Sequence, residues 1–215
     1  MFPLFFFASF SFKLPKFAAY TPEDWNKHGD EIREIYDCEL GWDLTDFGGG
    51  NFRKDGLLLF TIRNGVSGSS VYTKPYAEKI MISRSEQVTL MHCHEAKTED
   101  IINRGGGNLV FELFNRKGNA VELDRETPVT VSRDGELVTV APGAKLVLTP
   151  GESITLKPTL FHKFYAEKGG DVMIGEVSAV NDDHNDNVFY EPLLRFPVIE
   201  EDEAPYRLLV SDYRK

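Results

Sequence analysis

The chain has 215 residues, enough for one well-packed domain, and its 41% hydrophobic and 27% charged content is ordinary for a globular protein. Its formal net charge of −10 argues against a nucleic-acid partner, because phosphate binding requires clustered lysine and arginine. The two cysteines, Cys38 and Cys93, cannot build a disulfide framework and are compatible with a cytoplasmic location. No segment is long and apolar enough to cross a membrane, so we expect no membrane partner.

Residues 1–55 are expected to form a helical and loop extension ahead of the main body. The first ten residues, MFPLFFFASF, are apolar but lack the basic start and the cleavage site of a signal peptide. We therefore expect them to form a helix or strand that packs on the domain. Thr21 can cap a helix that begins at Pro22, with acidic residues in its first turn. Gly41 is expected to end this helical region.

From residue 56 to 180 the chain shows short runs rich in β-branched and aromatic residues. The expected strands are 57–62, 79–83, 87–94, 108–114, 128–132, 136–140, 145–149, 153–157, 160–166 and 172–178. Asp134-Gly135, between two of these runs, is a strong signal for a two-residue hairpin. Many short strands, with helical pattern only at the front, favour a mainly β fold built as an antiparallel barrel or sandwich.

Residues 181–215 form a segment of different character. Residues 181–187 and 199–205 are acidic and are expected to be solvated loops. Residues 206–210, YRLLV, are a candidate for one last strand. We expect the whole chain to form one domain, with residues 56–180 as its core and residues 181–215 as a closing segment.

The sharpest feature of the sequence is His92-Cys93-His94. In a strand, residues two apart point to the same face, so His92 and His94 project together and Cys93 points away. Val88 and Leu90 fall on the histidine face by the same alternation, which suggests that this face is the interior. Two imidazoles that converge inside a barrel are a natural pair of metal ligands.

Glu99 and His162 are the candidates to complete a metal site. Glu99 lies five residues after His94, so a bend could bring its carboxylate to the pair, and His162 lies in another expected strand. A histidine taken alone is more often a hydrogen-bonded core residue than a ligand, and His162 is therefore weaker evidence than the pair. Three imidazoles and one carboxylate suit Mn, Fe, Co, Ni or Zn better than Ca or Mg.

Two stretches resemble the motifs of the cupin superfamily. The positions that match the first motif are His92, His94, Glu99 and Gly106. The positions that match the second motif are Gly151, Pro158 and His162. The glycine that usually follows the proline is replaced by Thr159 here, which is expected to affect the turn more than the ligands.

Longer stretches resemble the D-lyxose isomerase family, from about Lys13 to the C-terminus. They are residues 41–48, 56–65, 76–81, 99–115, 175–187 and 191–205. Two departures are Cys93, where the family more usually has an aromatic residue, and the short phenylalanine-rich start. The resemblance implies a cupin-type antiparallel β-barrel, or jelly roll, with an N-terminal helical segment. It also implies a homodimer that binds one divalent metal ion, with manganese ahead of cobalt, nickel, zinc and iron.

The activity implied by the resemblance is aldose–ketose isomerisation of a monosaccharide, typically D-lyxose to D-xylulose and often D-mannose to D-fructose. Hydrogen moves between C1 and C2 through a metal-stabilised enediol, which requires a base. Glu191 and Glu176 are the candidate bases, and Lys97 is a candidate acid, electrostatic partner and sugar contact. Asp182 and Arg195 are candidates for contacts with sugar hydroxyls. For each of these carboxylates an ordinary surface position is about equally plausible.

Several alternatives remain at this point. Glu112 alternates with Val110 and Phe114 in an apolar strand, so it is either another group near the metal or a buried carboxylate that needs a partner. The chain could instead be another cupin enzyme, such as a dioxygenase or a phosphosugar isomerase, or a non-catalytic sugar-binding cupin. A phosphosugar enzyme should carry a basic cluster, and Arg104 is the only local hint of one.

Overall fold

The computed structural model describes residues 2–198 and 202–213. Residues 199–201 of the expected acidic loop lie outside this part of the chain. Within the described ranges, no helix has the length and apolar character needed to span a membrane.

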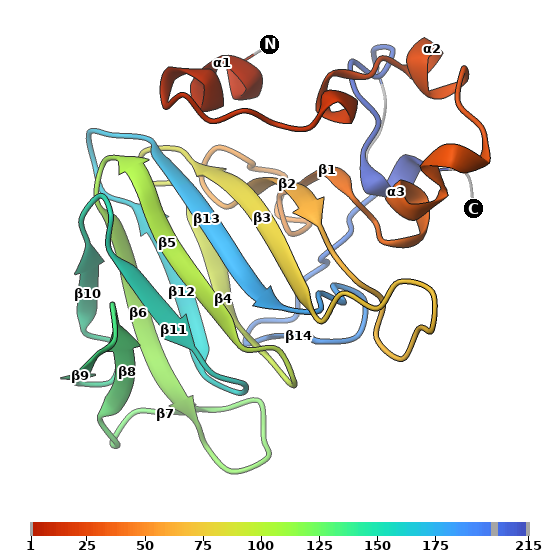
Figure 1. The fold of residues 1–215 in the computed structure, drawn as a ribbon. Helices are drawn as coiled ribbons and strands as arrows, with labels where there is room; N and C mark the ends of the chain where they lie inside the picture. The colour runs from red at the N-terminus through yellow and green to blue at the C-terminus, as the bar shows by residue number, and fades with distance from the viewer. Residues whose placement is uncertain (1, 199–201, 214–215) are drawn as a thin grey trace.

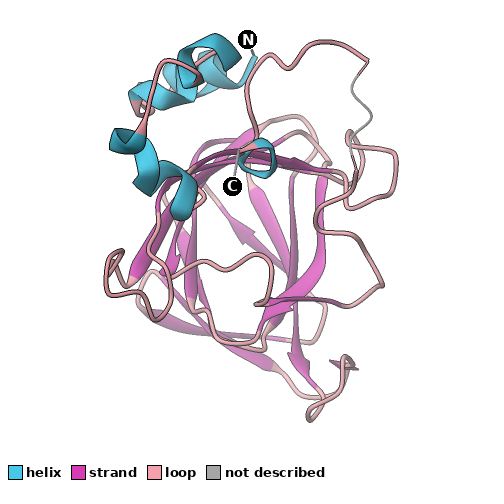
Figure 2. Ribbon diagram, turned by 90° about the vertical axis from the view of Figure 1, so that its right-hand side faces the viewer, coloured by secondary structure: helices cyan, strands magenta, loops and turns pink. Residues whose placement is uncertain are grey.

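Two antiparallel sheets form the body of the molecule (Figure 1). The larger sheet has, in spatial order, β1 (Gly41–Thr45), β2 (Leu57–Arg63), β3 (Tyr76–Ser83), β13 (Val172–Ala179), β5 (Glu99–Gly106), β11 (Ser153–Leu156), β8 (Val129–Arg133) and β9 (Glu136–Val140). The smaller sheet has β10 (Lys145–Leu148), β6 (Leu109–Arg116), β12 (Phe161–Ala166), β4 (Val88–His94) and β14 (Asn187–Phe189), and β7 (Leu123–Asp124) pairs with β6. Figure 2 shows the strands curling around a common interior, as expected for a jelly-roll barrel.

The main core lies between the two sheets, because each strand turns alternate side chains inward. Met81 and Ile174 from the larger sheet belong to one buried cluster with Phe111 and Phe164 from the smaller sheet. Burying an apolar side chain of this size contributes roughly 1.5–3 kcal/mol. At one end of this interior, polar side chains replace apolar ones, and the functional pocket lies there.

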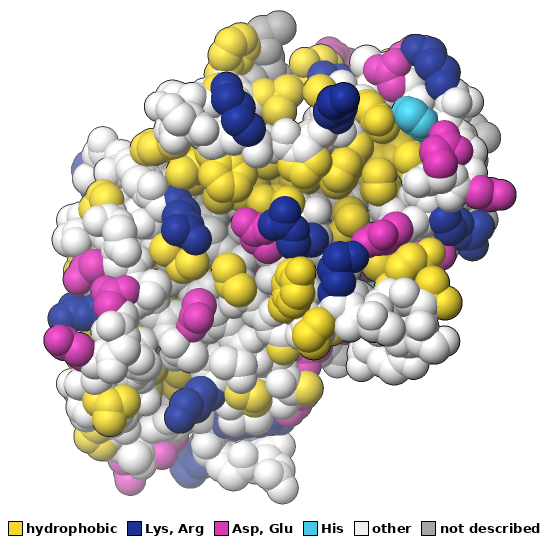
Figure 3. Space-filling model, viewed as in Figure 1, with side chains coloured by type: hydrophobic (Ala, Val, Ile, Leu, Met, Phe, Trp, Pro, Cys, Tyr) yellow, Lys and Arg dark blue, Asp and Glu magenta, His cyan; other side chains and the backbone are white. Residues whose placement is uncertain are grey.

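The apolar N-terminus forms α1 (Phe2–Ser9), which packs on the outer face of the larger sheet. Phe7 is buried and stacks against Trp42, and Phe60 is in the same cluster. Figure 3 shows hydrophobic side chains gathered in a band beneath this segment. The expectation that the first ten residues pack on the domain is therefore confirmed for the described part of that segment.

The next helical region is shorter and more broken than expected. Thr21 caps α2 (Pro22–Trp25) in a capping box with Asp24, as the sequence indicated. Helical structure then resumes only in η2 (Asp30–Ile32) and α3 (Arg33–Asp37), and short 3₁₀ turns form η1 (Lys16–Ala19) and η3 (Val210–Asp212). Gly41 does not end a helix; it begins β1 with φ of 136°, and a Cβ there would lie 2.1 Å from Tyr213 Oη.

Three other expectations need correction. Residues 99–106, which were not among the expected strands, form the central strand β5, which pairs with both β13 and β11. Residues 187–189, within the expected closing segment, form β14 beside β4. Residues 206–210 form no strand; Leu209 makes one isolated bridge to Trp42 before η3.

Candidate metal centre and active site

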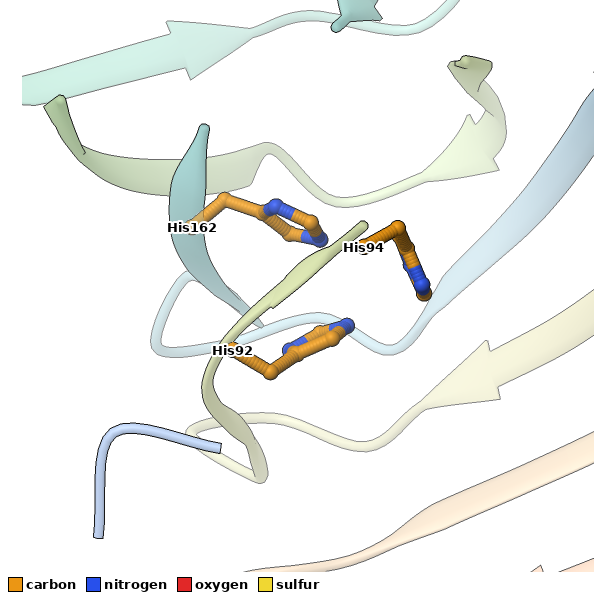
Figure 4. Close-up of side chains that lie close together, drawn as sticks. All are labelled: His92, His94 and His162. Atoms are coloured by element: carbon orange, nitrogen blue, oxygen red, sulfur yellow. The ribbon is translucent and has the colours of Figure 1, made fainter. Parts of the chain in front are cut away.

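Three histidines from the smaller sheet converge inside the barrel (Figure 4). His92 and His94 lie on β4, and His162 lies opposite His92 on the neighbouring strand β12. Each can offer one ring nitrogen such that all three nitrogens lie within 4.8 Å of one another. All three side chains are buried. The fold therefore brings His92 and His94, the predicted pair of metal ligands, together with His162.

A β-bulge in β4 changes which of its residues share the histidine face. His162 pairs with His92, but Phe164 pairs with Thr89, so the register shifts by one residue between them. Thr89 therefore lines the pocket with the histidines, and the expectation that Val88 and Leu90 do so is wrong. Cys93 packs on the opposite side in a buried apolar cluster, as the alternation predicted.

Glu99, the first residue of β5, reaches the histidines from the larger sheet. Its Oε1 lies 3.3 Å from His94 Nε2 and 3.2 Å from His162 Nε2. Neither Glu99 Oε1 nor His162 Nε2 has a hydrogen-bond partner, although both atoms are buried. Leaving a buried polar atom without a partner costs about 1–3 kcal/mol. A shared cation would satisfy both atoms, so this donor set fits a metal ion.

The rings of His92 and His162 are held with Nε2 free to act as a ligand. The Nδ1 atoms of His92 and His162 lie 2.7 Å from Leu90 O and 3.0 Å from Leu160 O. A carbonyl oxygen can only accept, so each Nδ1 carries the proton and each Nε2 carries a lone pair. Burial, with the neighbouring histidines, holds the pKa of His92 well below its usual range. His92 is therefore neutral, which is the form that binds a metal.

Lys97 and Glu176 lie beside these ligands. Lys97 Nζ is 2.9 Å from Glu176 Oε1 and 3.0 Å from Glu99 Oε2, and all three side chains are buried. Burial lowers the pKa of Lys97, but the attraction of Glu176, Glu99 and Asp183 outweighs it and raises that pKa overall. Burial alone would raise the pKa of Glu99, and Lys97 and His94 instead hold it well below its usual range. The pocket therefore keeps an ammonium and a carboxylate charged out of water.

Two charged residues that the sequence interpretation missed complete this network. Lys79 Nζ on β3 lies 3.6 Å from both Glu176 Oε1 and Asp183 Oδ2. Burial opposes ionisation of Asp183, but Lys79, Arg195 and Lys97 hold its pKa well below its usual range. Lys79 could have been found, because it alternates with Met81 on the inward face of an expected strand. Asp183 could not be separated from its neighbour Asp182 within a loop.

Arg195 reaches the same pocket from the C-terminal segment. Its Nη2 lies 3.1 Å from Asp183 Oδ2 and also bonds Asp43 on β1. Burial lowers the pKa of Arg195, but Asp183 and Asp43 outweigh it and raise that pKa. The segment after β14 is thus tied to the barrel at this point.

The other candidates lie outside the pocket. Glu191 is exposed and is not among its lining residues. Asp182 lines a neighbouring hollow and accepts hydrogen bonds from Asn185. Glu112 is not near the histidines; its partner is Lys163, 2.9 Å away. The pocket is lined by Phe47, Leu57, Leu59, Lys79, Met81, Thr89, His92, His94, Lys97, Glu99, Ile101, His162, Phe164, Glu176, Asp183, Asn187, Phe189 and Arg195.

Thr159, which stands where the second cupin motif usually has glycine, takes a glycine-like conformation. Its φ is 65°, and its amide donates a 2.7 Å hydrogen bond to His94 O. This hydrogen bond ties the end of β4 to the start of β12. The replacement leaves His162 among the histidines, as expected, and places a β-branched residue at a positive φ.

Comparisons with known proteins identify the family of this chain. The family model described as D-lyxose isomerase matches residues 4–213. A D-lyxose/D-mannose isomerase from Serratia proteamaculans is 53% identical over 97% of this chain and 91% of its own. Another from Escherichia coli O157:H7 is 49% identical over 98% of this chain and 92% of its own.

Solved structures show the same fold at low identity. An Acinetobacter sp. DL28 L-ribose isomerase variant in complex with L-ribose has a TM-score of 0.53 and 12% identity over 90% of each chain. A Cellulomonas parahominis L-ribose isomerase with L-psicose has a TM-score of 0.51 and 14% identity over 88% of each chain. Given the full-length family match and the two close relatives, the chain belongs to the D-lyxose isomerase family and is a sugar aldose–ketose isomerase with a cupin fold.

Proposed function

We propose that this enzyme is metal-dependent and interconverts D-lyxose with D-xylulose and D-mannose with D-fructose. The names of the two close relatives support these substrates. The observation that carries the metal dependence is the pair of buried, unpartnered atoms Glu99 Oε1 and His162 Nε2, which lie 3.2 Å apart. These two atoms lie next to a buried Lys97–Glu176 ion pair.

His92, His94, Glu99 and His162 would hold one divalent cation, and we propose manganese. Three imidazoles with one carboxylate form a mixed nitrogen and oxygen set that suits a transition metal. A bound cation would supply Lewis-acid stabilisation of negative charge on the sugar oxygens.

Glu176 is the proposed base. Its carboxylate lines the pocket and is held by Lys97 at 2.9 Å, whereas Glu191 is exposed and does not line it. Glu176 takes the proton from C2 of the open-chain aldose and returns it to C1, which gives the ketose. Lys97 donates a proton to the C1 oxygen and recovers one from the C2 oxygen, so the number of protons is unchanged.

The two carboxylates can be tested against each other. Glu176→Gln should lower kcat by at least about 100-fold, because it removes the base, and should leave the bound metal unchanged. Glu191→Gln is the matched control and should stay close to wild type. Isomerase rates and metal content measured on both variants show which of the two carboxylates acts as the base. If Glu191→Gln is the slow variant, Glu191 is the base.

We further propose that the chain works as a homodimer, as its resemblance to the family implies, and that it does so in the cytoplasm, with which its two cysteines are compatible. Light scattering should then give about twice the chain mass of 24.3 kDa. A single-chain mass across the micromolar range would contradict the dimer.

A further inference from the structure

We infer that Asp186 is a positioning residue of the metal centre, which holds the His94 ring in the orientation and proton form that bind the cation. The observation that carries this is a second pair of buried, unpartnered atoms, His94 Nδ1 and Asp186 Oδ2, which lie 3.6 Å apart. This inference rests on the proposed metal dependence and adds a residue behind the proposed ligands.

His94 differs from the other two histidines in what lies behind its ring. The Nδ1 atoms of His92 and His162 each face a backbone carbonyl oxygen. His94 Nδ1 has no hydrogen-bond partner in the part of the chain that the structure describes. Its Nε2 lies toward the other proposed ligands, 3.3 Å from Glu99 Oε1. If Nε2 is to carry a lone pair, Nδ1 must carry the proton, and that buried N–H group needs an acceptor.

The fold holds Asp186 where this acceptor is needed. Asp186 directly precedes β14, in which Asn187 pairs with His94 on β4. Its backbone oxygen accepts a 3.0 Å hydrogen bond from Glu95 N, and its Oδ1 accepts a 2.7 Å hydrogen bond from Ala96 N. The backbone and one carboxylate oxygen of Asp186 are therefore fixed, and the second oxygen is left beside His94.

The carboxylate of Asp186 would act on the metal through His94. The separation of 3.6 Å is about 0.4 Å longer than an ordinary hydrogen bond. A cation on Nε2 withdraws electrons from the ring, which makes Nδ1–H a stronger donor and favours closure of this gap. A carboxylate behind a ligand histidine fixes its tautomer and raises its basicity. His94 is therefore a stronger electron donor than His92 or His162, whose Nδ1 atoms face neutral carbonyl groups.

Only a carboxylate can serve both neighbours of this side chain. Ala96 N and His94 Nδ1 are both donors, and each lies beside a different oxygen of Asp186. An asparagine has one acceptor and one donor at these two places, so its amide NH₂ must face one of the two N–H groups. Asp186→Asn therefore keeps the shape of the side chain and removes its function.

The test is the affinity for manganese, measured by calorimetry on protein first stripped with a chelator. Asp186→Asn should raise the Kd for manganese by about 10- to 100-fold, because it removes the partner of a ligand histidine. Glu95→Gln is the matched control for charge, since Glu95 lies beside the same turn but is 46% exposed and pairs with Arg116. Asn185→Ala is the control for the loop, since it removes hydrogen bonds to Asp182 only. Both controls should bind manganese like wild type.

A measurement on the wild-type protein depends on no variant. In the zinc-loaded protein, ¹H–¹⁵N NMR should show a proton on Nδ1 of His94. Its signal should lie at lower field than those of His92 and His162, because its acceptor is charged. A His94 ring with its proton on Nε2, or with no ring proton, would overturn the inference.

The outcomes distinguish the role of Asp186 from the proposed function. If the wild-type protein binds no divalent metal, the proposed metal dependence fails and this inference fails with it. If the wild type binds manganese and Asp186→Asn binds it equally well, only the role of Asp186 is overturned. Asn185→Ala that binds as weakly as Asp186→Asn would overturn it too, because the loop and not the carboxylate would then be responsible.

Discussion

Lys97→Met should destabilise the protein strongly, because it removes the ammonium that two buried carboxylates share. Lys97 Nζ lies 3.0 Å from Glu99 Oε2 and 2.9 Å from Glu176 Oε1, and its side chain is 2% exposed. At an effective dielectric constant of about 20, each contact contributes about 5.5 kcal/mol of attraction before desolvation. The methionine side chain fills a similar volume but leaves both carboxylates without this partner.

The net loss of stability depends on the two carboxylates that remain buried without this partner. Breaking a buried ion pair by removing one partner costs about 3–5 kcal/mol. For a domain of this size that corresponds to a fall in Tm of roughly 6–20 °C, at about 2–4 °C per kcal/mol. Thermal and urea unfolding of the metal-free protein at pH 7 would measure it. Lys27→Met is the control, because Lys27 is 69% exposed in its pair with Asp24. Its change should be within about 1 kcal/mol. A Lys97→Met protein as stable as this control would show that the buried ion pairs of Lys97 do not stabilise the fold.

Two other predictions concern Asp183 and Thr159. Because the folded-state pKa of Asp183 lies well below its unfolded value, its stabilisation is present above about pH 4 and is lost as pH falls through the folded pKa. Asp183→Asn should therefore lower stability at pH 7 and flatten its decline in acid, as urea titrations at several pH values would show; an unchanged pH profile would contradict this. Thr159→Gly should raise the free energy of unfolding by about 0.5–1 kcal/mol, since a β-branched residue at φ of 65° is strained and glycine is not. Thr130→Gly, on the exposed face of β8, should instead lower it, and the prediction fails if both changes have the same sign.

The sequence predicted the parts of the site that depend on local pattern. Strand alternation placed His92 and His94 on one face and Cys93 on the other, and the Asp134-Gly135 hairpin forms with Arg133 opposite Glu136. These predictions were correct because strand alternation and turn sequence are local properties of the chain.

The features that could not be predicted from the sequence depend on contacts between distant segments of the chain. Residues 99–106 contain charged residues and glycines that disfavour strands, but pairing with β13 and β11 on both sides makes them the central strand β5. The need for glycine at position 106 is visible only in the fold, because a Cβ there would lie 2.1 Å from Asp171 O. The bulge that turns Thr89 inward, and the choice of Asp183 over Asp182, likewise depend on tertiary structure.

We propose that one cation held by His92, His94, Glu99 and His162 is what makes this chain active as an aldose–ketose isomerase. The most direct measurement is the conversion of D-lyxose to D-xylulose by protein stripped with a chelator and then restored with manganese, with metal content determined on the same samples. We predict that activity disappears on stripping, returns at about one manganese per chain, and does not return in His162→Ala. Full conversion by metal-free protein would contradict the proposed metal dependence.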